Sequence, residues 1–180
     1  MEASLFHEWA PEPDGPTDSA AGDVSRSEPG DTPGGAIRIV VYGEAAPAGS
    51  KRSVMVGKKD GPKFMRTIDA NPKAAKWKDL VAQEAGRAMA GRDLLRGALE
   101  VTFTFFRRRP KGHFRMNGGV RPSAPGHPTT RPDATKLVRG VEDALTGVCW
   151  NDDAQIVAQG AFKCWGEPER VVIVVRELEP

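Results

Sequence analysis

The stretch of residues 131–155 constrains the fold most, because it reads as an amphipathic helix, a turn and the start of a strand. The helix begins at Asp133 and ends before Gly147, which makes it about four turns long. Apolar residues recur along one side at helical spacing: Leu137, Val138, Val141, Ala144 and Leu145. The opposite side carries Lys136, Arg139, Gly140 and Asp143. The apolar stripe predicts that this helix packs on the core of the domain.

Carboxylates mark both ends of this stretch. Asp133 opens the helix, whereas Asp152 and Asp153 precede the strand. The two helix ends are roughly 20 Å apart, but a strand that doubles back beside the helix could bring its carboxylate toward Asp133. Facing carboxylates in a basic chain favour a divalent-metal site, since hard cations such as Mg²⁺ take oxygen ligands. Alternatively, Asp133 only caps its helix, and the aspartate pair are turn residues.

These residues resemble the RusA-type Holliday-junction resolvases, which are small homodimeric, magnesium-dependent endonucleases of phages and bacteria. Three segments carry the resemblance: 132–133, the helix end 142–147 and the segment 150–157. The similarity is close from about 131 to 157 and looser from about 37 to the C-terminus. It implies a RusA-like fold, branched DNA as the substrate, and a homodimer that cuts phosphodiester bonds with Mg²⁺, for which Mn²⁺ can substitute.

The resemblance also assigns site residues. It implies that Asp133 and Asp153 are primary metal ligands and that Asp152 is an outer or alternate ligand. Lys136 and Arg139 are expected to face the scissile phosphate. Three positions depart from the family pattern: Thr135 replaces a second aspartate, Lys136 an asparagine and Arg139 a lysine.

Thr135 leaves alternatives open for the chemistry. The metal site is either incomplete or rebuilt around Asp152 or Asp143. The second functional hypothesis is a catalytically weakened or inactive branched-DNA-binding protein of the same fold.

Charge divides the chain into two parts. Residues 1–34 carry eight acidic side chains against Arg26 alone, a net of −7, and predict a disordered acidic tail. Residues 35–180 hold 25 basic and 16 acidic side chains, a net of +9, and form the predicted endonuclease domain. A basic domain favours a polyanionic partner.

The remaining pattern predicts strands at 37–42, 99–105, 154–163 and 170–176, and a helix from Pro72 to Gly91 with Asn71 as its cap. The run 171–175 is apolar on both faces and reads as a central strand. Irregular segments are expected at 47–69 and 107–130. This order predicts an α+β domain, a small mixed sheet with two helices packed on one face.

Both irregular segments are basic, and we expect their cations to contact DNA phosphates, with a merely solvated loop as the alternative. The predicted DNA-binding residues are Lys51, Arg52, Arg107, Arg108, Arg109, Lys111, Arg115, Arg121 and Arg131. No apolar run approaches the roughly 18 residues of a membrane span, and no signal peptide is evident, so a cytoplasmic protein is expected. Cys149 and Cys164 are expected to be free thiols.

Overall fold

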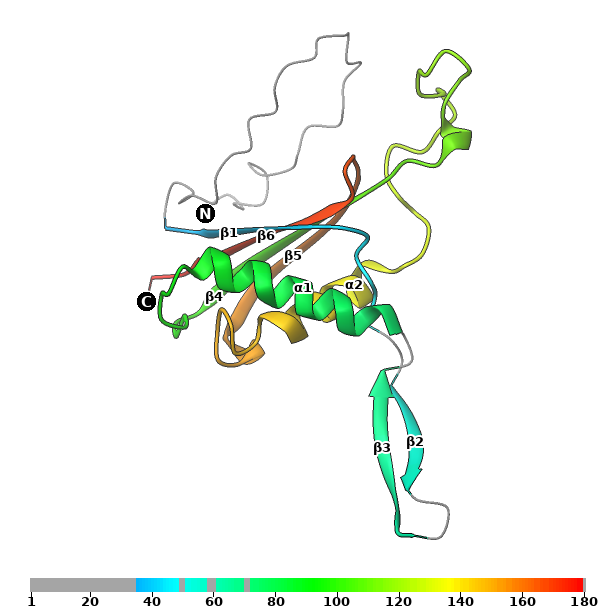
Figure 1. Ribbon diagram of the computed structural model, residues 1–180. Helices are drawn as coiled ribbons and strands as arrows, with labels where there is room; N and C mark the ends of the chain where they lie inside the picture. Colours follow the sequence, from blue (N-terminus) through cyan, green and yellow to red (C-terminus); the bar gives the residue numbers. More distant parts are fainter. Residues whose placement is uncertain (1–34, 49–50, 58–60, 70–71, 180) are drawn as a thin grey trace.

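The computed structural model describes residues 35–48, 51–57, 61–69 and 72–179, so the predicted acidic tail at 1–34 lies outside the described residues. Its centre is a four-stranded sheet in the order β1-β6-β4-β5 (Figure 1). The strands are β1 (Ile37–Tyr42), β4 (Leu99–Arg107), β5 (Ile156–Trp165) and β6 (Arg170–Glu177). β6 is antiparallel to both β1 and β4, whereas β4 and β5 are parallel. The sheet is mixed, as predicted.

The interior of the sheet follows the apolar pattern. β6 lies between β1 and β4, and Val171 and Ile173 are fully buried, which confirms the central-strand prediction. Phe103 and Phe105 of β4 stack at 6.4 Å and are also buried. β5 is left at one edge, and it starts two residues later than predicted because a 3₁₀ turn, η3 (Asp153–Gln155), precedes it.

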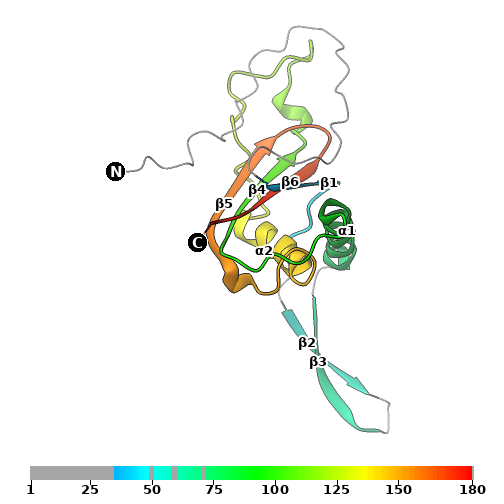
Figure 2. The ribbon, with the colours of Figure 1, turned by 90° about the vertical axis from the view of Figure 1, so that its left-hand side faces the viewer.

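Two helices, α1 (Pro72–Met89) and α2 (Ala134–Leu145), cover one face of the sheet, which confirms the predicted α+β class (Figure 2). Trp77 of α1 is buried in the core, and Lys78 Nζ lies 2.6 Å from Asp143 Oδ2 of α2. The predicted apolar stripe of α2 is buried. At Gly140 a Cβ atom would lie 3.0 Å from the Ala46 carbonyl oxygen, so glycine permits the segment 46–48 to cross the helix closely.

The prediction of a loop at 47–69 is wrong. The segment forms an antiparallel hairpin, β2 (Lys51–Gly57) and β3 (Lys63–Asp69), that projects away from the sheet (Figure 1). Consecutive apolar residues pair across the strands, Met55 with Met65 and Val56 with Phe64. Such cross-strand pairs stabilise a hairpin even without a core beneath it. None of the helices in the described part of the chain is long and apolar enough to cross a membrane.

Candidate active site and nucleic-acid interface

Asp133 stands at the N-cap position of α2 with an extended backbone, but its carboxylate makes no capping hydrogen bond. Its Oδ2 lies 3.6 Å from Lys136 Nζ, and both side chains are more than half exposed. Thr135 and Arg139 are exposed on the same helix. The structure therefore does not support the simple capping explanation for Asp133. It presents an exposed carboxylate beside Lys136, one of the two cations that the resemblance places at the scissile phosphate.

The backbone before Asp133 is fixed by side chains from the ends of two strands. Lys163 Nζ of β5 donates to the carbonyl oxygens of Thr130 at 2.7 Å and Pro132 at 3.0 Å. Arg107 of β4 donates from NH1 to the Arg131 carbonyl oxygen at 2.8 Å. These three hydrogen bonds fix the backbone of residues 130–132, just before α2. Lys163 was not among the site residues predicted from the sequence.

The aspartate pair lies beyond the other end of α2. Asp153 Oδ1 accepts hydrogen bonds from Thr146 Oγ1 at 2.5 Å and Trp150 Nε1 at 2.9 Å. Asp152 Oδ1 accepts from the Ala154 amide at 2.8 Å, and Gln155 Oε1 accepts from the Asp152 amide at 3.0 Å, which makes a capping box. Both aspartates thus have a turn-forming role here, as the alternative interpretation expected.

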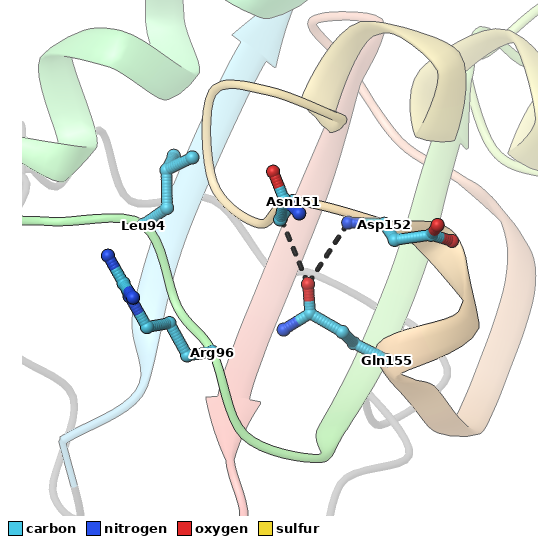
Figure 3. A pocket seen from close by; sticks show the side chains of 5 residues that line it. All are labelled: Leu94, Arg96, Asn151, Asp152 and Gln155. Atoms are coloured by element: carbon cyan, nitrogen blue, oxygen red, sulfur yellow. Dashed lines mark hydrogen bonds between the residues drawn. The ribbon is translucent and has the colours of Figure 1, made fainter.

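Asp152 borders a shallow pocket of about 440 Å³ lined by Leu94, Arg96, Asn151, Asp152 and Gln155. Figure 3 shows the Gln155 side chain closing the turn from below, while the Asp152 carboxylate points away from Arg96. The pocket is therefore walled by a turn rather than by converging carboxylates.

Glu142 joins Asp153 at this end of α2, and the sequence reading did not single it out. Burial raises the pKa of Glu142 above its ordinary value, and the charges of Asp153 and Asp143 raise it further. A hydrogen bond from Gln159 of β5 and the charge of Arg139 act in the opposite direction. The sequence held one signal that Glu142 lies at this end of the site: it stands four residues before Thr146, and residues four apart share one helix face.

The structure does not bring the predicted metal ligands together within one chain. α2 has 12 residues, so Asp133 and Asp153 are separated by a helix about 18 Å long. β5 does run back beside α2, but the residue that reaches the Asp133 end is Lys163. Among the described residues no group of three or more His, Cys, Asp and Glu side chains could hold a metal ion. The residues of a single chain therefore do not fit one shared Mg²⁺ ion.

The predicted DNA-contact residues between Arg107 and Arg131 divide into two groups. Arg109 donates to the Pro125 carbonyl oxygen at 3.0 Å and stacks 5.2 Å from the centre of the Trp165 ring, and Arg121 Nε donates to the Phe114 carbonyl oxygen at 2.9 Å. These two, with Arg107, hold the loop in shape. Others are turned outward: Arg108, which lies 3.4 Å from Glu167, and Lys111, Arg115 and Arg131.

The loop 108–132 and the β2–β3 hairpin project from opposite sides of the domain, and the start of α2 lies between them in both ribbon views (Figures 1 and 2). Lys51 and Arg52 begin β2, although their side chains lie outside the described residues. Asp133 is therefore flanked by the two segments predicted to contact DNA.

The fold and this site define a class of protein. The chain matches the family of endodeoxyribonuclease RusA over residues 44–176 and belongs to that family, which confirms the resemblance seen at 131–157. At the family level this means a Holliday-junction-resolving endonuclease that acts on branched DNA. The chain is also similar to the uncharacterized protein YqaN of Bacillus subtilis strain 168. The two are 29% identical over 145 residues, which are 79% of this chain and 96% of that protein.

Proposed function

We propose that this protein is a structure-selective endodeoxyribonuclease that resolves Holliday junctions by magnesium-dependent hydrolysis of phosphodiester bonds. The observation that carries the proposal is the match to the endodeoxyribonuclease RusA family over residues 44–176. That range contains both basic projections, Asp133 and the aspartate pair at 152–153. A DNA substrate agrees with the cytoplasmic location expected from the sequence.

The chemistry assigns roles to exposed residues of α2 and of the segments at its two ends. Lys136 and Arg139 are proposed to bind the scissile phosphate, Lys136 as a point charge and Arg139 with its planar fork of donors. Asp133, Asp152 and Asp153 are proposed as the oxygen ligands of Mg²⁺ or Mn²⁺. A homodimer is proposed because a four-way junction has two-fold symmetry and needs two symmetric cuts.

The alternative is a branched-DNA-binding protein with weakened or no catalysis. Thr135 favours it, since the family's second aspartate is missing next to Asp133. The two proposals are separated by incubating the protein with a synthetic four-way junction, with linear duplex as the control substrate, over a series of Mg²⁺ concentrations.

An endonuclease should release nicked duplexes from the junction only when Mg²⁺ is present, and Asp133→Asn should bind the junction without cutting it. A wild-type protein that retards the junction on a gel and leaves it uncut at every Mg²⁺ and Mn²⁺ concentration would support the binding protein instead.

A further inference from the structure

Exposed apolar side chains gather on the two basic projections, the β2–β3 hairpin and the loop 108–132. Among the described residues, eight large apolar side chains are exposed, and six of them lie on these projections: Met55, Val56, Phe64, Met65, Met116 and Val120. The hairpin carries four of the six. A group of neighbouring exposed apolar side chains marks an interaction surface. The hairpin is therefore a candidate for one.

The four apolar residues of the hairpin lie near its tip and on both of its faces. Successive residues of a strand point to opposite faces. The pair Met55–Met65 therefore lies on one face, and the pair Val56–Phe64 lies on the other. Met55 and Met65 are 68% and 70% exposed, and Phe64 is 60% exposed, so no part of the domain covers either face. An element that is apolar on both faces suits a space between two apolar surfaces.

Charge indicates which molecule offers those surfaces. Residues 51–69 carry six basic and two acidic side chains, a net of +4. A second copy of the chain would bring the domain at 35–180, of net +9, against this charge. DNA bases offer flat faces for stacking, and the phosphates beside them are negative. Charge complementarity therefore favours DNA over a second copy.

The thickness of the hairpin limits the kind of DNA that it can enter. At Gly57 a Cβ atom would lie 2.7 Å from the Pro62 carbonyl oxygen, so glycine keeps the two strands close at the tip. A two-stranded ribbon with side chains on both faces is still about 10 Å thick, whereas base pairs of a duplex are about 3.4 Å apart. A single side chain can enter such a step, but the ribbon cannot. An open four-way junction differs, because its base-pair stacks end at the branch point.

The base of the hairpin is fixed beside the start of α2. Ala48, three residues before β2, donates its amide hydrogen to the Lys136 carbonyl oxygen at 2.9 Å. Lys136 stands in the first turn of α2, three residues after Asp133. Met55 lies four residues beyond the start of β2, about 13 Å along the strand. A hairpin tip in the branch point therefore keeps Asp133 close to the strands that leave it.

We propose that the end of the β2–β3 hairpin is a branch-point wedge, in which Met55 and Met65 on one face, and Val56 and Phe64 on the other, stack on the last base pairs of the junction arms. The inference rests on the proposed function and names the feature that distinguishes a branched from a linear substrate. Insertion must unstack bases, and fewest are unstacked where a stack already ends. The wedge thus strengthens binding to a junction and not to a linear duplex.

Equilibrium binding in EDTA, where no strand is cut, tests the wedge. Met55→Gln and Phe64→Gln each place a neutral polar side chain on one face. Each should raise the Kd for a four-way junction about tenfold, because a stacking contact with a base is lost. The Kd for a linear duplex should change by less than about twofold, because the phosphate contacts remain.

Tyr42→Gln is the matched control for these substitutions. Tyr42 is also exposed (61%), but it lies on β1, outside both projections. This variant should bind the junction and the duplex as the wild type does. Equal losses on the two substrates for the hairpin variants, or no loss on the junction, would overturn the wedge.

The fluorescent base 2-aminopurine reports insertion directly, since stacking on neighbouring bases quenches its emission. At the branch point it should brighten when the wild-type protein binds, and in the middle of an arm it should not. The double variant Met55→Gln/Phe64→Gln, at a concentration that saturates the junction, should leave both probes dim. A branch-point probe that stays dim with the wild type, or brightens equally with the double variant, would contradict the wedge.

Sedimentation equilibrium and circular dichroism of the free variants separate the wedge from an interface between copies of the chain. Met55→Gln and Phe64→Gln should both keep the oligomeric state and the spectrum of the wild type. Dissociation of either variant into smaller species would show that the end of the hairpin packs on a second copy, and the wedge would be wrong.

The wedge and the proposed nuclease fail separately. A protein that binds junctions through the hairpin but leaves them uncut at every Mg²⁺ and Mn²⁺ concentration would remove the nuclease function and keep the wedge. A protein that nicks junctions, and whose hairpin variants bind them as tightly as the wild type does, would remove the wedge alone.

Discussion

Lys163 Nζ donates a hydrogen bond to the Pro132 carbonyl oxygen at 3.0 Å, which ties the end of β5 to the residue before Asp133. The same ammonium also holds Thr130. An edge strand thereby sets the position of an exposed carboxylate that α2 alone leaves unrestrained at its N-cap. Asp133 Oδ2 in turn lies 3.6 Å from the Nζ atom of Lys136, a cation on the same helix.

Lys163→Met should lower the rate of junction nicking about tenfold at saturating substrate, because the backbone just before Asp133 loses the hydrogen bonds at Thr130 and Pro132 that position it. The junction concentration for half-maximal rate should change little, since Lys163 is directed to carbonyl oxygens rather than outward. Arg176→Met on β6, which removes an ion pair to Glu100 at 3.2 Å, is the control and should nick normally. A large loss of junction affinity in Lys163→Met would show direct DNA contact instead.

Two substitutions at Asp153 should separate its structural role, as a hydrogen-bond acceptor, from its proposed role in cleavage. Asp153→Asn keeps an oxygen that can accept from Thr146 and Trp150, so the melting temperature should stay close to that of the wild type while cleavage is lost. Asp153→Ala leaves Nε1 of the buried Trp150 without its acceptor, which costs about 1–3 kcal/mol of unfolding free energy. Thermal denaturation and junction nicking measure the two effects separately. Normal cleavage by Asp153→Asn would remove Asp153 from the site.

The sequence predicted the sheet and its helices well because their residues repeat with the period of a strand or a helix. Residues 171–175 are apolar on both faces, and only a central strand buries both. The hairpin at 51–69 escaped prediction because it has no core to impose a one-sided pattern. Its basic residues hid the two neighbouring apolar pairs, Met55 with Met65 and Val56 with Phe64, that hold it together.

The candidate site was predictable by residue type but not by position. The sequence shows that Asp133 and Asp153 flank one helix, and the length of that helix already separates them by about 18 Å. Whether Asp153 comes close to Asp133 depends on where β5 begins. The turn that Asp152 caps and the hydrogen bonds from Thr146 and Trp150 keep Asp153 at the far end.

Glu142 should make the protein less stable as the pH rises. Its pKa is raised from the ordinary value of 4.5, mainly by burial, so the folded state binds its proton more tightly than the unfolded state. The stability linked to this group is present below about pH 4.5 and is lost as the pH rises through the folded pKa. Glu142→Gln should therefore melt higher than the wild type near pH 7 and like it near pH 3. Equal melting temperatures at both pH values would contradict this.

The exposed cations of the loop 108–132 should account for part of the salt dependence of DNA binding. Lys111→Ala and Arg115→Ala should each reduce the slope of log affinity against log salt by about 0.9, because each removes one phosphate contact. Arg109→Ala should also change Trp165 fluorescence, since its guanidinium stacks on that ring. Arg87→Ala on α1 is the control for lost charge and should keep the wild-type slope. Unchanged slopes for both loop variants would place the DNA elsewhere.

Thr135→Asp tests whether the candidate metal site is incomplete or rebuilt. Thr135 is exposed in the first turn of α2, where no acidic residue stands and where a negative charge stabilises a helix by about 0.3–1 kcal/mol. Asp143 lies in an ion pair with Lys78, and Asp152 caps a turn, so neither replaces the missing carboxylate beside Asp133. These contacts favour the incomplete site.

Thr135→Asp should accordingly lower the Mg²⁺ concentration for half-maximal nicking about tenfold, since a second anionic oxygen ligand strengthens binding of a hard cation. Thr135→Asn, neutral and similar in size, is the control and should resemble the wild type. The measurement is a Mg²⁺ titration of junction nicking, with melting temperatures to confirm that both variants fold. A variant that needs more Mg²⁺ than the wild type, or nicks more slowly at saturation, would show that the added charge crowds a site already rebuilt without it.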